Sequence, residues 1–187
     1  MKQEAVTKYI LRLAVTLLLI TGVVAAALAG VNSITAPEIA KNQQAKVWKA
    51  IQTVLPGAII SGEVAFSDTT GLIKMVYKSD VGYAVEVAPV GFGGAITMMV
   101  GVSHEGEILG MAVVSQTETA GLGAVVAADS HAGQLFRDQF VGLSGEVAVT
   151  KDGGSIDAIT GATITSRAVT EGVNAALQCV AQMEHLG

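Results

Sequence analysis

The sequence predicts an α+β protein in which one long apolar helix precedes an antiparallel sheet with flanking helices. Residues 13–31 form an apolar run without a charged residue. Between residues 58 and 115, short apolar segments alternate with turn sequences, which is typical of strands joined by hairpins. From residue 164 to residue 184, apolar residues return every three or four positions, as on one face of a helix.

The apolar run, LAVTLLLITGVVAAALAGV, would span roughly 28 Å as a helix, close to the hydrocarbon thickness of a bilayer. Two interpretations compete. A signal peptide would use Lys2, Lys8 and Arg12 as its basic region and would be cleaved near residues 25–29. An uncleaved anchor would use the whole run. We favour the anchor, because the run is longer than a usual signal core and no lipoprotein-type cysteine site is present.

The charges beside the run predict its orientation. Three basic residues precede the run, whereas residues 32–40 directly after it contain none. Basic residues near a span favour the cytoplasmic side, so we expect a single-pass protein of the cell (inner) membrane with its C-terminal domain on the extracytoplasmic side. The 8 basic and 15 acidic residues after Val31 give this part a net charge of −7. That balance argues against nucleic acid and anionic lipid as partners.

The sequence thus divides into four expected parts: a short cytoplasmic N-terminus (1–12), a transmembrane helix (13–31), a linker with an amphipathic helix (32–57) and a folded domain (58–187). Pro37 suits the first turn of the amphipathic helix. Apolar residues at helical spacing follow it, and Pro56 and Gly57 end the pattern.

Within the folded domain we expect strands at residues 59–66, 72–77, 83–90, 95–103 and 108–115. Their regular spacing favours antiparallel pairing. Short helices are expected between residues 124 and 140, and one long helix at 164–184. The single cysteine, Cys179, lies in the apolar pattern of that helix and is expected to be a buried thiol.

Four hydroxyl residues gather just before the last helix, in the string Thr160-Gly161-Ala162-Thr163-Ile164-Thr165-Ser166. A helix N-terminus offers backbone N–H groups and a positive dipole end, and both stabilise a phosphate. The small residues Gly161 and Ala162 let a bulky group approach, and Thr163 supplies a hydroxyl that can be esterified. The alternative on local physics is plain helix capping, and in either case we expect Thr165 and Ser166 to cap the helix.

The string from Asp157 to Thr163 resembles the target sequence of flavin transferases that esterify FMN onto a threonine. The resemblance implies that Thr163 carries covalent FMN through its phosphate, with Thr160, Gly161 and Ala162 as the recognition string. The domain at 58–187 would then be a covalent-FMN-binding domain.

Three further segments occur in the order of the same family: Gly91-Phe92-Gly93-Gly94-Ala95-Ile96, residues 106–110 and Glu118-Thr119-Ala120-Gly121-Leu122-Gly123. Together they resemble the FMN-binding domain shared by the RnfG component of the Rnf electron transport complex and the C component of the sodium-pumping NADH:quinone reductase. The resemblance implies flavin contacts from Glu118, Thr119, Leu122 and Gly123. Two departures are visible, since Ala120 replaces the usual proline and Gln116 a common histidine.

The resemblance implies an electron-transfer component of an ion-translocating ferredoxin:NAD+ oxidoreductase, which relays electrons through its FMN. Its implied partners are the membrane, the other membrane, iron–sulfur and flavin subunits of the Rnf complex, and a flavin transferase. We expect no independent catalytic residues and no metal ligands in this chain, because its three histidines lack metal-ligand spacing. Two alternatives remain: the C component of the quinone reductase, which is usually longer, and an anchored, non-redox binding or assembly module in which Thr163 only caps a helix.

Overall fold

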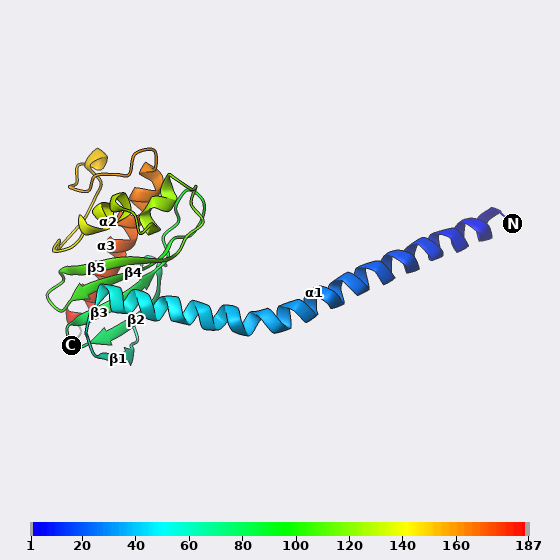
Figure 1. The fold of residues 1–187 in the computed structure, drawn as a ribbon, viewed down its shortest axis with the longest axis horizontal. Helices are drawn as coiled ribbons and strands as arrows, with labels where there is room; N and C mark the ends of the chain where they lie inside the picture. The colour runs from blue at the N-terminus through cyan, green and yellow to red at the C-terminus, as the bar shows by residue number, and fades with distance from the viewer. Residues whose placement is uncertain (1, 186–187) are drawn as a thin grey trace. The chain divides into compact units, whose positions relative to one another are not determined.

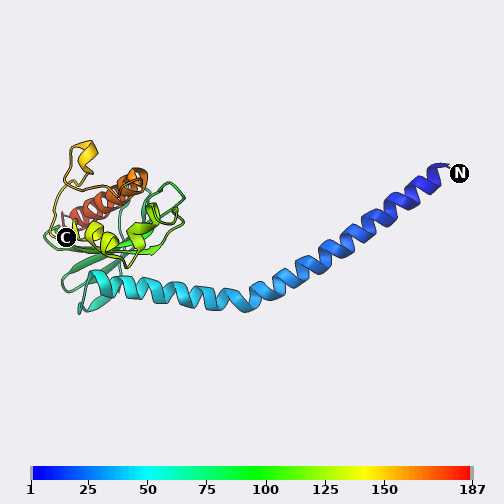
Figure 2. The same ribbon diagram turned by 45° about the horizontal axis from the view of Figure 1, so that its top comes forward.

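The computed structural model describes residues 2–185 and confirms the α+β class (Figures 1 and 2). In chain order its elements are α1 (Lys2–Val54), β1 (Ile60–Glu63), β2 (Ile73–Ser79), β3 (Gly82–Val87), β4 (Thr97–Ser103), β5 (Ile108–Ser115), the 3₁₀ helix η1 (Gly123–Ala127), α2 (His131–Asp138), the 3₁₀ helix η2 (Thr150–Asp152) and α3 (Thr163–His185). The chain divides into two compact units, Met1–Ala45 and Lys46–Gly187.

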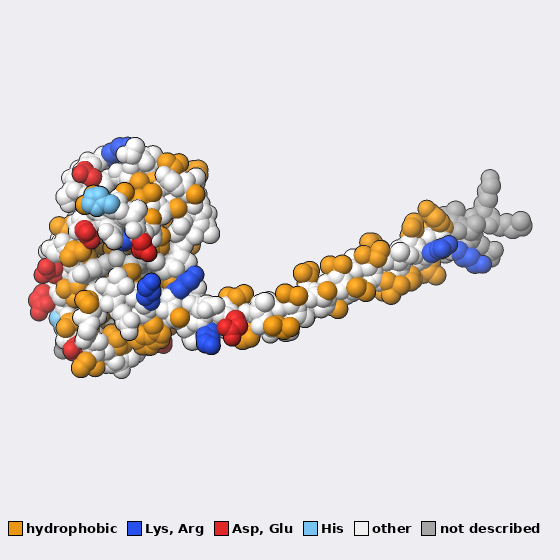
Figure 3. Space-filling model, viewed as in Figure 1, with side chains coloured by type: hydrophobic (Ala, Val, Ile, Leu, Met, Phe, Trp, Pro, Cys, Tyr) orange, Lys and Arg blue, Asp and Glu red, His pale blue; other side chains and the backbone are white. Residues whose placement is uncertain are grey.

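The first unit contains the apolar part of α1. The stretch Thr7–Val54 is long enough and apolar enough to cross a membrane, and none of the side chains in its most apolar window is buried. Hydrophobic side chains occur along the visible face of this helix (Figure 3), and Leu18 and Val23 are each 70% exposed. An apolar helix whose side chains are not buried by the described part of this chain fits a single-pass membrane anchor.

Helix α1 continues through residues 32–34, where we expected a polar linker. The polar side chains there bond back to the helix instead of interrupting it. Ser33 Oγ donates to the Gly30 carbonyl at 2.8 Å, and Thr35 Oγ1 donates to the Val31 carbonyl at 3.0 Å. Pro37 lies inside the helix rather than in its first turn. Because proline has no backbone N–H, one hydrogen bond to the preceding turn is missing there.

Within residues 2–185 the strands form one antiparallel sheet in the order β1-β2-β3-β4-β5, each hydrogen-bonded to the next along the chain. All five expected strands are present, and β5 has the expected bounds. β1, β3 and β4 are shorter than expected, whereas β2 begins one residue later and ends two residues later than expected. Short helices and one long C-terminal helix also occur where the sequence placed them.

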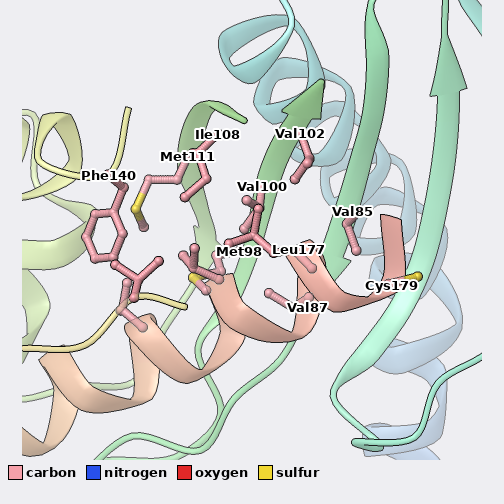
Figure 4. Close-up of a cluster of buried hydrophobic side chains, with 14 of the residues drawn as sticks. Val85, Val87, Met98, Val100, Val102, Ile108, Met111, Phe140, Leu177 and Cys179 are labelled. Atoms are coloured by element: carbon pink, nitrogen blue, oxygen red, sulfur yellow. The ribbon is translucent and has the colours of Figure 1, made fainter. Parts of the chain in front are cut away.

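One face of the sheet packs against α3 and forms the larger core. Alternate residues of β3 and β4, including Val85, Val87, Met98 and Val100, point to this face, because successive side chains of a strand lie on opposite sides (Figure 4). Phe140 and Cys179 complete the same core and are at most 2% exposed, which confirms the expected buried thiol.

The opposite face packs against the last turns of α1, through Ala50, Ile51 and Val54, and against Leu55 just after the helix. Gly101 of β4 pairs with Gly110 of β5 directly beneath this helix. A Cβ atom on Gly101 would lie only 2.7 Å from the Val54 carbonyl oxygen, so the missing side chain allows the close approach. The sheet is therefore held between two helices, with the start of α3 at the edge of the larger core.

Candidate functional site

The hydroxyl-rich string forms a tight turn that leads directly into α3. Gly161 has φ +76°, in the left-handed region that side chains rarely adopt. The Ala162 N–H donates to the Ile159 carbonyl at 2.9 Å, and α3 begins at the next residue, Thr163. Thr163 is therefore the first residue of the helix, partly exposed, beside N–H groups that have no partner within the helix.

Thr165 and Ser166 do not cap the helix, so that expectation was wrong. Both lie inside the first turn of α3 and are at most 1% exposed. Ser166 Oγ donates to the Ala162 carbonyl at 3.0 Å and accepts the Ile159 N–H at 3.1 Å. Thr165 Oγ1 donates to Glu118 Oε2 at 2.5 Å. Each hydroxyl fastens a preceding loop to the helix.

Glu118 joins three segments at the edge of the sheet. Its side chain is 8% exposed. Oε2 accepts from Thr165 of α3, and Oε1 accepts the Gly93 N–H of the β3–β4 connection at 2.7 Å. A Cβ atom added to Gly123 would collide with Glu118 and Thr165, so glycine is required where the loop crosses them. The carboxylate thus fixes the 118–123 loop against the helix start.

The 118–123 loop contains a β-turn. The Leu122 N–H donates to the Thr119 carbonyl at 3.1 Å, and Gly121 has φ +74°. A positive φ at the third position is the mark of a type II turn, whose second position commonly holds proline. Ala120 occupies that second position, which gives a physical reason for the proline usual in the family loop.

A pocket of about 400 Å³ lies between this loop and the start of α3. It brings together seven of the eight residues singled out in the sequence: Glu118, Thr119, Leu122, Gly123, Gly161, Ala162 and Thr163. Thr160 does not line the pocket, although it belongs to the turn that shapes it. Two motifs far apart in the sequence therefore form one concave site.

The pocket also contains residues that sequence reasoning did not assign to it: Phe92, Lys151, Ile164 and Thr165. Phe92 lies within the glycine-rich segment already noted and is 71% exposed. Lys151 had no signal in the sequence, because a single lysine in a loop is ordinary. The apolar side chains Phe92, Leu122 and Ile164 give the pocket exposed apolar walls.

The η2 turn places two charged residues beside the first turns of α3. Lys151 Nζ donates to Thr163 Oγ1 at 3.2 Å. One helical turn further, Arg167 donates two hydrogen bonds to Asp152, at 2.7 and 2.6 Å. The Arg167 hydrogen bond, with smaller contributions from the charges of Arg167 and Lys151, lowers the pKa of Asp152 despite partial desolvation.

Two known family models match this chain. A model of the FMN-binding domain matches residues 91–178, which includes the pocket and most of α3. A model of the RnfG N-terminal region matches residues 1–54, which corresponds to α1.

Two relatives match nearly the whole chain, and a third matches about half of it. The G component of the Na(+)-translocating ferredoxin:NAD(+) oxidoreductase complex of Acetobacterium woodii is 35% identical, over 91% of each chain. The G component of the ion-translocating oxidoreductase complex of Methanosarcina acetivorans is 33% identical, over 95% of this chain and 98% of that one. The G component of the proton-translocating ferredoxin:NAD(+) oxidoreductase complex of Clostridium ljungdahlii is 41% identical over 54% of each chain. With its anchor-like helix, its FMN-binding domain and these relatives, the chain belongs to the RnfG family of ion-translocating oxidoreductase (Rnf) complexes.

Proposed function

We propose that this chain carries FMN in the pocket between the 118–123 loop and α3, with the phosphate esterified to Thr163 Oγ1. The observation that carries the proposal is that the two predicted motifs line one pocket, with the Thr163 hydroxyl at a helix N-terminus. The pocket volume of about 400 Å³ lies within the range of about 300–1,000 Å³ that is usual for cofactor sites.

The residues present suit the two ends of this cofactor. Phe92, Leu122 and Ile164 offer apolar surface for a flat ring, and the main chain of the Thr119–Leu122 turn offers polar groups for its edge. The first turn of α3 offers backbone N–H groups and a positive dipole end for the phosphate. When bound, the flavin ring supplies the redox chemistry, and the protein holds and orients it.

Of the four hydroxyls in the string, Thr163 is the one suited to modification. Thr165 and Ser166 are buried and already hydrogen-bonded, and Thr160 does not line the pocket. Thr163 is partly exposed and lines the pocket, and its protein partner is the flexible end of a lysine. A flavin transferase would therefore find Thr163 Oγ1 at the surface, without unfolding the helix.

The biological role follows from the family. We infer that the chain relays electrons within a membrane-bound ion-translocating ferredoxin:NAD+ oxidoreductase, between other iron–sulfur and flavin subunits. The names of the Acetobacterium woodii and Clostridium ljungdahlii relatives support this role. Each relative reported above is named as the G component of its complex, which favours that component over the C component of the quinone reductase.

Flavin fluorescence on a denaturing gel tests the attachment. The full chain is co-expressed with a flavin transferase, and wild type is compared with Thr163→Ala and Thr163→Ser. We expect a fluorescent band for wild type, no band for the alanine variant, and a weaker band for serine, which keeps a hydroxyl. A wild type without fluorescence would leave the anchored, non-redox module as the better explanation, and a fluorescent alanine variant would place the flavin elsewhere.

We also propose that the domain lies on the extracytoplasmic side, with α1 as its single-pass anchor. An introduced cysteine at the exposed Lys78 provides the test, with a membrane-impermeant maleimide applied to spheroplasts. Burial, and to a smaller extent the charge of Asp68, raises the pKa of the native Cys179 thiol, so this residue reacts slowly. Labelling of Lys78→Cys before lysis supports the orientation, and labelling that requires lysis contradicts it.

A further inference from the structure

The η2 turn holds Lys151 at the pocket, and the backbone of this turn is anchored to the rest of the domain. Residues on both sides of the turn are anchored in the core, where Val149 and Ile156 form a parallel bridge and are at most 1% exposed. The Thr150 N–H donates to the Ile156 carbonyl at 2.8 Å, and the Asp152 N–H donates to the Val149 carbonyl at 2.8 Å. The position of the Lys151 backbone is therefore fixed, while its side chain remains exposed.

The neighbouring charges leave the Lys151 ammonium available for a ligand. Asp152, the nearest carboxylate in sequence, accepts two hydrogen bonds from Arg167. Glu118, the carboxylate that lines the pocket, accepts from Thr165 and from the Gly93 N–H. Lys151 forms no ion pair among residues 7–184, and it is the only basic side chain that lines this pocket in the described part of the chain. The hydrogen bond that it does make is to the Thr163 hydroxyl.

We propose that Lys151 is the residue that binds the phosphate on Thr163. This inference rests on the proposed function, because it concerns the phosphate of the attached FMN. The ammonium lies 3.2 Å from Thr163 Oγ1, so a phosphate bonded to that oxygen is within reach of the flexible lysine side chain. A charge-assisted hydrogen bond to an anionic oxygen is stronger than the present bond to a neutral hydroxyl.

Lysine and the helix N-terminus would act together on the phosphate. The first turn of α3 contributes N–H groups and dipole from one side, and η2 contributes the ammonium from the other. The Asp152–Arg167 pair keeps the turn beside the helix, because Arg167 lies one helical turn after Thr163. In the transfer, Thr163 Oγ1 loses its proton and bonds to the flavin-side phosphorus of a flavin dinucleotide, while the pyrophosphate bond breaks and the nucleoside monophosphate leaves. Lys151 stabilises the incoming flavin phosphate and then neutralises the phosphoester.

The first test is the rate of flavin incorporation, measured by intact mass on the full chain with purified transferase. Lys151→Ala and Lys151→Gln should incorporate flavin roughly tenfold more slowly, as expected for one lost charge-assisted hydrogen bond. Lys151→Arg keeps the charge and should stay within about threefold of wild type. The control is Lys74→Ala, which removes an exposed lysine of β2 outside the pocket and should match wild type.

The second test separates phosphate binding from recognition of the lysine by the transferase. Phosphorus NMR is recorded on the flavin-loaded full chain in detergent, and the Lys151→Gln variant is loaded by prolonged incubation with the transferase. Relative to wild type, the phosphoester resonance should be shifted in Lys151→Gln and unchanged in Lys74→Ala. If Lys151→Gln incorporates flavin at the wild-type rate, or if its phosphorus resonance coincides with that of wild type, the inference is overturned while attachment at Thr163 stands. A wild type that takes up no FMN overturns both proposals.

Discussion

The two walls of the pocket hold the start of α3 by different physical means. The 118–123 loop uses a buried carboxylate, Glu118, whose two oxygens accept from Thr165 and from the Gly93 N–H. The η2 turn uses exposed contacts, in which Lys151 reaches Thr163 and Asp152 pairs with Arg167. Buried hydrogen bonds to a charged group cost much to lose, whereas exposed ion pairs contribute little to stability.

This difference assigns separate tasks to the two walls. We expect the 118–123 wall to determine whether the pocket exists, since Glu118 and its partner Thr165 are both buried away from water. We expect the η2 wall to determine how strongly the pocket binds an anion. Substitutions in the first wall should therefore change folding stability, and substitutions in the second should change the rate of flavin incorporation.

The largest effect is expected from Glu118→Ala. The change leaves the Thr165 hydroxyl and the Gly93 N–H without their acceptor, so the free energy of unfolding should fall by about 3 kcal/mol. Urea denaturation of the full chain in detergent measures it. Glu118→Gln keeps one acceptor oxygen and should lose less. If Glu118→Ala unfolds at the wild-type urea concentration, the proposed difference between the walls is wrong.

A smaller loss is expected from Gly123→Ala, which tests packing of the same wall. The added methyl group would meet the Glu118 carboxylate and the Thr165 hydroxyl, and such overpacking typically costs about 1–3 kcal/mol. Thermal unfolding reports the change. Gly30→Ala is the matched control, because its added carbon meets no atom within 4 Å apart from the nearby backbone of its own helix, so stability should not fall. Equal behaviour of both variants would contradict the crowded geometry at Gly123.

A modest gain is expected from Ala120→Pro. Residue 120 is the second position of the Thr119–Leu122 turn, where proline fits a type II turn and restricts the unfolded chain. The free energy of unfolding should rise by about 0.5 kcal/mol. Denaturation curves compared with wild type check it. Loss of stability would mean that the turn has a different backbone geometry from the one described.

The smallest effect on stability is expected from Asp152→Asn, in the other wall. The Arg167 hydrogen bond lowers the pKa of Asp152 below its ordinary value of 3.8. The ion pair therefore contributes above pH 3.8 and is lost as the pH falls through the lower folded value. Any difference between wild type and Asp152→Asn should appear at neutral pH and vanish in strong acid. A difference as large as that of Glu118→Ala at pH 7 would remove the distinction between the walls.

Much of the fold could be predicted because its signals are local. Turn sequences separate the strands of the sheet, and apolar spacing defines α3, so the elements were placed close to their observed bounds. The linker before Pro37 could not be predicted, because Ser33 and Thr35 can either interrupt a helix or bond back to it. Only the surrounding helix decides between these outcomes.

The site was predictable where the sequence carries a motif and not where the fold alone brings residues together. The strings around Glu118 and Thr163 identified most of the pocket. Lys151 comes from a loop without a motif, and its position depends on the Val149–Ile156 bridge. The capping role expected for Thr165 was wrong for a related reason, since its partner, Glu118, is distant in sequence and close only in the folded chain.

Peptide mapping by mass spectrometry tests the central claim most directly. Cleavage after Lys151 and Arg167 gives one peptide that contains Ser155, Thr160, Thr163, Thr165 and Ser166, so fragmentation must locate the flavin within it. We predict that this peptide gains the mass of FMN less one water, and that the added mass lies on Thr163. A peptide without added mass, or a flavin on any of the other hydroxyls, would contradict the proposed attachment.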